Sequence, residues 1–126
     1  MVIQPSIGLV ELNSIARGIE TADAMWKIAT VELVDAYAIC PGKYIILITG
    51  ILADVQSSVN KGIEIASEHL IDSLIIPNVS NKVIPAILGT SEIRENIVAV
   101  GSIETFSVAS CIIASDAAAK KQMLSL

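Results

Sequence analysis

The sequence predicts an α+β fold in which helices pack against a mainly antiparallel, four-stranded sheet. Three observations lead to this prediction. Short β-rich runs alternate with amphipathic helical segments, a Pro-Gly dipeptide joins two of these runs as a hairpin, and the pattern of the first strand and helix recurs late in the chain. We therefore expect one complete α+β unit followed by the first strand and helix of a second copy.

The first strand and helix open the predicted unit. Residues 7–12 are expected to form the strand, and the hydroxyl of Ser14 can cap the following helix by accepting from an unpaired first-turn N–H. Apolar residues recur along this helix at spacings of three and four, which predicts a buried stripe made of Ile15, Ile19, Ala22, Met25, Trp26 and Ala29. Met25 and Trp26 are expected to pack in the core.

A hairpin is predicted next. Its strands cover residues 31–39 and 44–48 and flank Pro41-Gly42, a dipeptide that favours a tight turn. Cys40 is thus expected at a loop tip, within reach of a symmetry-related copy. One cysteine cannot hold a metal alone, whereas three copies around a threefold axis would offer three thiols.

A second helix is predicted after Gly50, with Asp54 near the positive end of its dipole. Its apolar stripe consists of Val55, Val59, Gly62, Ile63, Ala66 and Leu70. His69, the single histidine, comes near the end of this helix and is expected at the surface.

The unit is expected to close with a strand and a short helix. The strand covers residues 70–76 and stops at Pro77, and the helix covers residues 82–88. Asn81 is the expected cap of this helix and Gly89 its end.

The sequence from Val100 onward repeats the sequence from Ile7 onward. With a constant shift of 93 and no gap, residues 7–33 and 100–126 share nine identities in 27 positions, namely Gly8/Gly101, Glu11/Glu104, Ser14/Ser107, Ala16/Ala109, Ile19/Ile112, Asp23/Asp116, Ala24/Ala117, Lys27/Lys120 and Leu33/Leu126. This match predicts a tandem duplication, with domains at 1–96 and 97–126. The second copy is then truncated, and we expect the chain to be part of a longer tandem protein. Cys111 is expected in the core of that copy.

Composition restricts the function. A net charge of −5, a pI near 4.7 and only one Trp, two Tyr and one Phe argue against a nucleic-acid partner. The hydrophobic fraction is 53%, yet the longest apolar run, residues 44–53, is too short to span a membrane, so we expect an oligomer with large subunit contacts.

Two further expectations concern chemistry and location. No nucleophile–base pair or convergent carboxylates are visible, which argues against an enzyme. Residues 1–5 lack the features of a signal peptide, and the widely spaced Cys40 and Cys111 are typical of reduced cytosolic thiols, although a disulfide between them stays open.

Four stretches carry a resemblance to a known family: residues 7–11 (IGLVE), 22–29 (ADAMWKIA), 50–62 and 71–77 (IDSLIIP). In their order and spacing, the chain resembles the bacterial microcompartment shell proteins. The resemblance implies a shell domain over 1–96, the start of a second shell domain over 97–126, and a structural role in the shell of a cytoplasmic compartment. It also implies other shell proteins as partners, and neither nucleic acid nor membrane.

Within that family, the chain looks most similar to the tandem-domain trimer subunits of propanediol-utilisation compartments. The turn Ile39-Cys40-Pro41-Gly42-Lys43 matches their first-domain pore loop. The resemblance implies a homotrimer, pseudohexameric at full length, in which Cys40 from three chains ligates a shared [4Fe–4S] cluster for electron or cluster transfer across the shell. Ile39, Pro41, Gly42 and Lys43 would then line the pore, and Lys27 would lie at the tile edge.

Two other functions compete with this interpretation. The first is a metal-free tile whose pore passes small metabolites, with Cys40 only lining the channel. The second is an α+β oligomer that senses a small molecule bound between subunits. The sensor ranks lower, because the sequence offers no Gly-rich phosphate loop with a basic partner.

Overall fold

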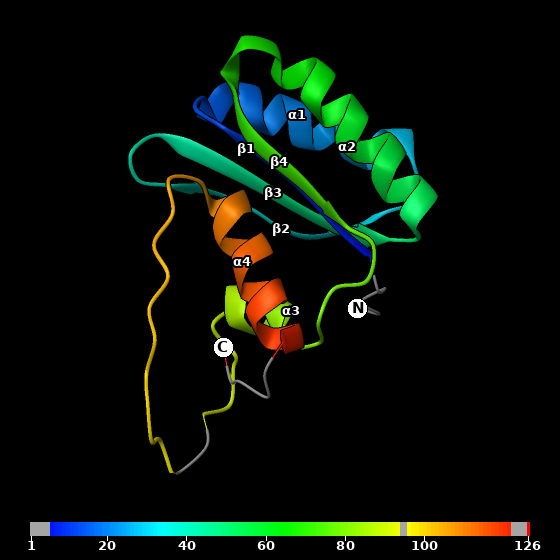
Figure 1. The fold of residues 1–126 in the computed structure, drawn as a ribbon. Coiled ribbons are helices and arrows are strands. Elements are labelled where there is room, and N and C mark those ends of the chain that lie inside the picture. The colour runs from blue at the N-terminus through cyan, green and yellow to red at the C-terminus, as the bar shows by residue number, and fades with distance from the viewer. Residues whose placement is uncertain (1–5, 94–95, 122–125) are drawn as a thin grey trace.

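A computed structural model describes residues 6–93, 96–121 and 126 of the chain. A four-stranded antiparallel sheet carries helices on both faces, which confirms the predicted α+β fold (Figure 1). In chain order the elements are β1 Ser6–Leu12, α1 Ile15–Ile28, β2 Glu32–Ile39, β3 Lys43–Gly50, α2 Leu52–Ala66, the 3₁₀ turn η1 Ser67–His69, β4 Leu70–Ile76, α3 Val83–Ile87 and α4 Val108–Lys121.

The strand order in the sheet is β2-β3-β1-β4, so β1 lies in the interior and pairs with strands on both sides. Glu11 of β1 is the residue opposite Ile45 of β3 and Asp72 of β4. Because successive side chains of a strand point to opposite faces, Glu11 shares one face with Asp72 and Lys43. That face is the one covered by α3 and α4.

The two faces of the sheet carry separate apolar cores. Helices α1 and α2 cover one face, where buried β1 and β3 side chains pack with helix side chains: Val10, Leu12, Met25, Val31, Ile46, Ile48, Val55, Val59 and Ala66. Helices α3 and α4 cover the other face, whose core consists of Ile7, Leu9, Ile45, Leu47, Leu74, Ile76, Val83, Ile84, Ala109 and Ile112. Figure 1 shows these two layers on either side of the sheet.

Close helix approach on the α1–α2 face depends on small residues. A Cβ added at Gly18 of α1 would lie 2.5 Å from the ring of Tyr44, and one added at Gly62 of α2 would lie 2.6 Å from the sulfur of Met25. Ser58 of α2 donates its hydroxyl to the carbonyl of Met25 at 2.9 Å, which ties the two helices together. Larger side chains at Gly18 or Gly62 would separate these layers.

The predicted stripe of α1 is only partly correct. Met25 is buried as expected, but the other buried positions are Gly18 and Thr21. Ile15, Ile19 and Trp26, which were expected in the core, are exposed instead. The reason is geometric: α1 approaches α2 and β3 so closely that only its narrow side fits between them, and the bulky stripe faces outward.

The other elements agree more closely with those predicted from the sequence. The expected hairpin, strand and stripe of α2 are present, with Val55, Val59, Gly62 and Ala66 buried. Helix α3 begins at Val83 with Lys82, not Asn81, as its cap residue, and no side chain caps it. The chain leaves this helix at Gly89, whose φ of 70° is one that glycine adopts readily.

The second copy differs from its expected structure at the strand. Its helix is formed as α4, but residues 100–105, where the repeat predicts a strand, are extended and belong to no strand. Strand β1 is held by β3 and β4, and the sequence up to Leu126 contains no counterparts of those two strands. The apolar side chains along this segment are therefore exposed: Ile97, Val98, Val100, Ile103 and Phe106.

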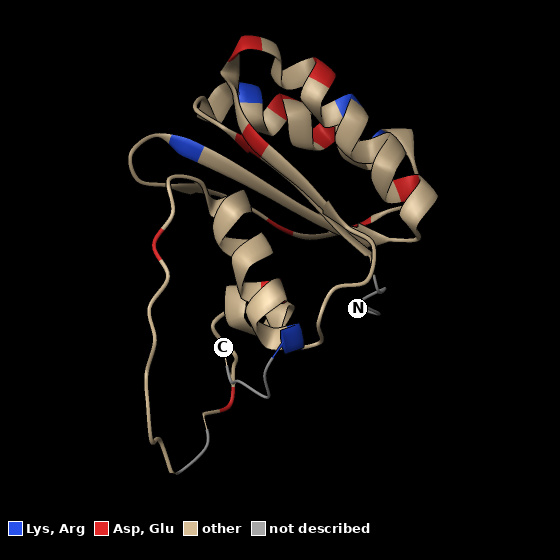
Figure 2. Ribbon diagram, viewed as in Figure 1, with Lys and Arg blue, Asp and Glu red and all other residues tan. Residues whose placement is uncertain are grey.

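Charged residues are concentrated on the outward sides of α1 and α2, as Figure 2 shows. Within the described ranges, none of the helices has the length and apolar character needed to cross a lipid bilayer. The signal-peptide expectation concerns residues 1–5, which lie outside the described part of the chain.

Candidate functional site

The hairpin between β2 and β3 presents Cys40 at its tip. β2 ends at Ile39 and β3 begins at Lys43, so Cys40, Pro41 and Gly42 form the turn, and all three are exposed. Gly42 has a φ of 74°, in the left-handed region that favours glycine, and an added Cβ there would have no atom within 4 Å. The turn is therefore open to approach from outside the subunit.

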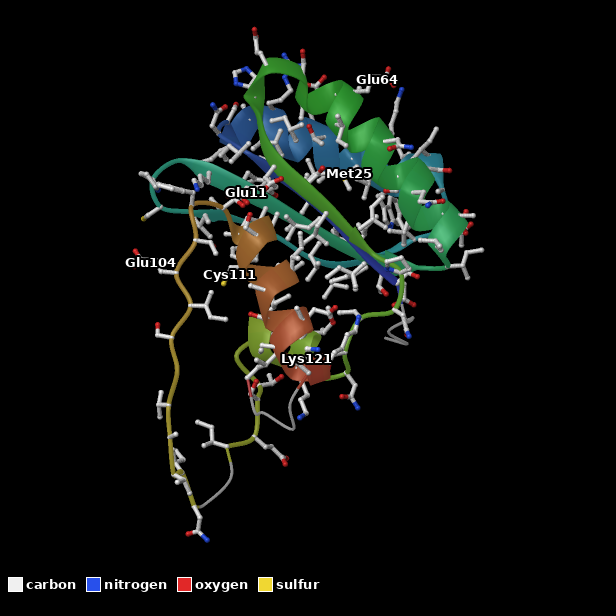
Figure 3. The ribbon with its side chains drawn as sticks, in the orientation of Figure 1. Glu11, Met25, Glu64, Glu104, Cys111 and Lys121 are labelled. Carbon is white, nitrogen blue, oxygen red and sulfur yellow. The ribbon has the colours of Figure 1, made fainter. Side chains whose placement is uncertain are left out.

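Both cysteines are free thiols, so the disulfide that the sequence left open is not present. Cys111 lies on α4 and is half-buried rather than in the core, because the helix turns Ala109 and Ile112 toward the sheet (Figure 3). Among residues 6–93, 96–121 and 126, no group of three His, Cys, Asp or Glu side chains could hold a metal ion. One subunit thus offers a single thiol at its tip.

The two residues beside the turn point back into the subunit. Ile39 is half-buried and packs against the core of the α3–α4 face. The Nζ of Lys43 lies 3.2 Å from Oε2 of Glu11 and donates to the carbonyl of Phe106 at 3.3 Å. Lys43 therefore links the base of the hairpin to the sheet and to the segment that leads into α4.

Glu11 is the centre of a polar cluster buried under the start of α4. Its side chain is fully buried, and its Oε1 accepts from the backbone N–H groups of Val108 at 2.9 Å and Ala109 at 3.2 Å. These N–H groups form the positive end of the helix dipole, which favours a carboxylate. Figure 3 shows Glu11 on the sheet, next to the first turn of α4.

Asp72 extends this cluster on the neighbouring strand. Its Oδ2 accepts from the hydroxyl of Ser107 at 2.6 Å and from that of Ser110 at 3.4 Å. Ser107 in turn caps α4, because its Oγ accepts from the N–H of Ser110 at 3.0 Å. We refer to Glu11, Lys43, Asp72 and Ser107 as the polar anchor.

The anchor changes the titration of one of its members. The hydrogen bond from Ser107 holds the pKa of Asp72 below its usual range, and bonds from Ser73 and Ser110 act in the same direction, while burial opposes them. Nearby on β2, burial and the charge of Asp35 raise the pKa of Tyr37. Asp72 is thus kept as an acceptor for α4 in neutral solution.

The far end of α4 is held by a second carboxylate. Oδ1 of Asp116 accepts from the backbone N–H of Ser80 at 2.7 Å, and Oδ2 of Asp116 lies 2.6 Å from Nζ of Lys120. Between the two ends, Ala109 and Ile112 are buried against the sheet. Polar contacts at both ends therefore fix the position of α4 along the sheet.

Sequence reasoning treated Glu11 only as a repeat position, equivalent to Glu104, and missed its structural role. The available signal was a lone carboxylate in the apolar strand SIGLVEL, on the side shared with Ile7 and Leu9. Lys27, expected at a tile edge, is exposed on α1 and lies 2.7 Å from Oδ2 of Asp23. Lys27 belongs to α1 on the α1–α2 face of the sheet, whereas the Lys43–Glu11 pair at the base of the hairpin lies on the α3–α4 face.

Comparisons with known proteins give a consistent result. Residues 6–79 match the family described as the BMC domain. The chain is 43% identical over 121 residues to the bacterial microcompartment shell protein PduT of Citrobacter freundii, covering 96% of this chain and 65% of that protein. It is 36% identical over 62 residues to the carboxysome shell protein CcmK2 of Synechocystis, covering 49% of this chain and 60% of that protein.

A solved structure shows the same likeness. A microcompartment protein from Desulfitobacterium hafniense superposes with a TM-score of 0.74 and 49% identity, covering 93% of this chain and 64% of that chain. In each of these three cases, the chain spans less than two thirds of the length of the protein that it matches.

Proposed function

Because the chain belongs to the BMC-domain family of bacterial microcompartment shell proteins, we propose that it is a structural shell subunit whose hairpin tip carries a thiol to a threefold axis. The subunit would assemble with other shell proteins into the coat of a compartment in the cytoplasm. This role fits its similarity to PduT over most of the chain and the many apolar side chains that it exposes. No catalytic role is proposed.

We further propose that residues 97–126 begin a second shell domain and that three chains form a pseudohexagonal tile. The support is the gapless repeat with a shift of 93, together with a helix at the repeated position. Two domains per chain and three chains give six similar units around one axis. On such a tile, equivalent hairpins meet in threes.

The proposed cluster site depends on the exposed thiol of Cys40. Iron–sulfur clusters are held by cysteine thiolates, so a cluster needs several thiols in one place. The described part of a single subunit offers no such group, but Cys40 is free and exposed at an open turn. These properties fit a [4Fe–4S] cluster held by Cys40 from three chains, which when bound would supply one-electron transfer across the shell.

The neighbours of Cys40 would shape that centre. Pro41 and Gly42 are exposed and would line the pore, whereas Ile39 and Lys43 are anchored in the subunit and would hold the turn in place. The ion pair of Lys43 with Glu11 fixes the first residue of β3. Cys40 would therefore be presented on a supported hairpin, with Lys27 remaining as the proposed edge residue.

Anaerobic purification of the complete gene product tests the cluster. The wild type should contain iron and acid-labile sulfide and show visible cluster absorbance, and Cys40→Ser should lose all three while the trimer persists. Cys111→Ser is the matched control, because Cys111 is half-buried on α4 and should leave the cluster unchanged. Equal iron and sulfide in the wild type and Cys40→Ser would remove Cys40 from this role.

A metal-free tile with a small-metabolite pore is the competing outcome of the same experiment. Absence of iron and sulfide after anoxic preparation and reconstitution would favour it.

Shell membership has its own test, in which the tagged protein is expressed in cells that make compartments. Failure to sediment with purified compartments would contradict the shell role itself.

A further inference from the structure

A single buried carboxylate joins the hairpin that carries Cys40 to the start of α4. Oε2 of Glu11 lies 3.2 Å from Nζ of Lys43, the first residue after the turn. Oε1 of the same side chain accepts from the backbone N–H groups of Val108 at 2.9 Å and Ala109 at 3.2 Å. The two oxygens of one carboxylate therefore bind two different elements, and the hairpin and the helix share one support.

The register of the sheet brings Lys43 within reach of Glu11. Glu11 is the partner of Ile45 across the strand pair, and Lys43 precedes Ile45 by two residues on the same face of β3. Cα atoms in this diagonal relation lie about 7–8 Å apart, a gap that the long side chain of lysine spans. Ile39 pairs with Lys43 at the end of the hairpin and packs against the core of the α3–α4 face. Both residues that flank the turn are thus attached to that face.

The turn between these two residues has few contacts of its own. Cys40, Pro41 and Gly42 are exposed, and a Cβ added at Gly42 would have no atom within 4 Å. By contrast, the side chain of Lys43 is only 22% exposed and that of Glu11 is fully buried. Opposite charges attract more strongly in such surroundings than in water, so this pair restrains the hairpin more than a surface ion pair would.

Lys43 also contacts the segment that leads into α4. Its Nζ donates to the carbonyl of Phe106 at 3.3 Å, and Figure 1 shows this segment passing beside the β2–β3 hairpin. The next residue, Ser107, donates to Oδ2 of Asp72 on β4 at 2.6 Å. The hairpin, two neighbouring strands and the start of α4 therefore meet in one connected group of charges and hydrogen bonds.

We propose that Glu11 is a positioning residue for the Cys40 thiol and that it acts through Lys43. With this ion pair formed, the turn keeps one orientation relative to the sheet and to the start of α4. The inference rests on the cluster role proposed above, because three thiols share one cluster only when each is presented at a defined position. Neither Glu11 nor Lys43 is itself a ligand in this role.

Hydrogen exchange in the metal-free complete gene product, followed by mass spectrometry, tests the inference. Lys43→Met removes the ammonium and should speed exchange at the tip, residues 39–43, by about tenfold, the factor expected when one hydrogen bond to a charged group is lost. Glu11→Gln should speed exchange at the tip and also in the first turn of α4, because Glu11 supports both elements.

Two control variants separate this effect from a general loosening of the fold. Ile112→Ala opens a cavity further along α4 and leaves the polar anchor intact, so exchange should rise in α4 and stay unchanged at the tip. Lys43→Arg keeps the positive charge and should retain most of the protection at the tip. Circular dichroism checks that each variant folds.

Cluster loading gives a second measurement on the same variants. After anoxic reconstitution, the iron and sulfide content should fall in Lys43→Met and in Glu11→Gln. Ile112→Ala should load like the wild type, because it leaves the support of the turn in place.

The outcomes distinguish this inference from the proposed function. Unchanged exchange at the tip in Lys43→Met and Glu11→Gln, or an equal rise in Ile112→Ala, overturns the positioning role whether or not the protein holds a cluster. Full loading in Lys43→Met and Glu11→Gln also overturns it, because the thiols would then meet without the pair. A wild type without iron and sulfide overturns the cluster role, whereas faster exchange at the tip would still show that the pair holds the turn.

Discussion

Helices α1 and α4 share a sequence pattern and bury opposite sides. α1 buries Gly18, Thr21 and Met25 and exposes Ile19, whereas α4 buries Ala109, Ile112 and Asp116. The counterpart of Gly18 on α4 is Cys111, which is only half-buried. Each helix thus has two sides able to pack, and the side that becomes covered depends on which sheet is available to it. Four predictions test this comparison.

Glu11→Gln should have the largest effect. It removes the charge that holds the N–H groups of α4 and leaves the Lys43 ammonium without its buried partner, at a cost of about 3 kcal/mol in the free energy of unfolding. The repeat-matched control is Glu104→Gln, which should change that free energy in the 126-residue chain by less than about 0.5 kcal/mol. Urea unfolding measures both. Equal effects would show that Glu11 does not hold α4.

Ile112→Ala should have the next largest effect. Removing a buried isoleucine leaves a cavity between α4 and the sheet and should lower the free energy of unfolding by about 2–3 kcal/mol. At the exposed counterpart, Ile19→Ala should change it by less than about 0.5 kcal/mol in the isolated chain. Chemical denaturation of both variants gives the difference. A large loss of stability in Ile19→Ala would mean that the Ile19 side chain is covered within one subunit.

The two capping serines should differ by a smaller amount. Ser14→Ala removes a helix cap and should cost about 1 kcal/mol. Ser107→Ala removes a cap and also the hydrogen bond to Asp72, so its cost should be about 1 kcal/mol greater. Thermal unfolding of both variants measures this difference. Identical costs would indicate that the bond to Asp72 contributes nothing to docking.

The smallest expected effect is a pH dependence at Asp72. Because its folded pKa is lowered, its contribution to stability is present above the usual aspartate value of about 3.9 and is lost as the pH falls through the lower folded value. Docking of α4 should therefore weaken below about pH 4. Ser107→Ala should raise the pKa of Asp72 toward its usual value, which carboxyl NMR titration detects. An unchanged pKa would contradict the assignment of its cause.

Most of the BMC domain over residues 6–79 was predictable because its signals are local. The turn at Pro41-Gly42, the cap at Ser14 and the end of β3 at Gly50 each depend on residues that are adjacent in sequence. The burial of α1 was not predictable in this way. Bulky Ile15, Ile19 and Trp26 suggested a core stripe, but close packing selected Gly18 and Thr21, a choice that depends on Tyr44 and α2.

The candidate site was predictable only in part, for a similar reason. The position of Cys40 on a hairpin tip follows from the local sequence, and the structure agrees. The polar anchor joins residues from β1, β3, β4 and the start of α4, so their contacts depend on register and on where α4 docks. The metal prediction depends on three hairpin tips meeting, because the described part of one subunit offers a single exposed thiol there.

The extended segment before α4 has a consequence for protein synthesis. Val98, Val100 and Phe106 emerge from the ribosome after the four strands of the sheet, as an exposed apolar stretch that belongs to no strand. Such stretches are sites of chaperone capture and of edge-to-edge aggregation. Preparations of this 126-residue chain should therefore precipitate at high concentration, and polar replacements at Val98 and Phe106 should keep it in solution.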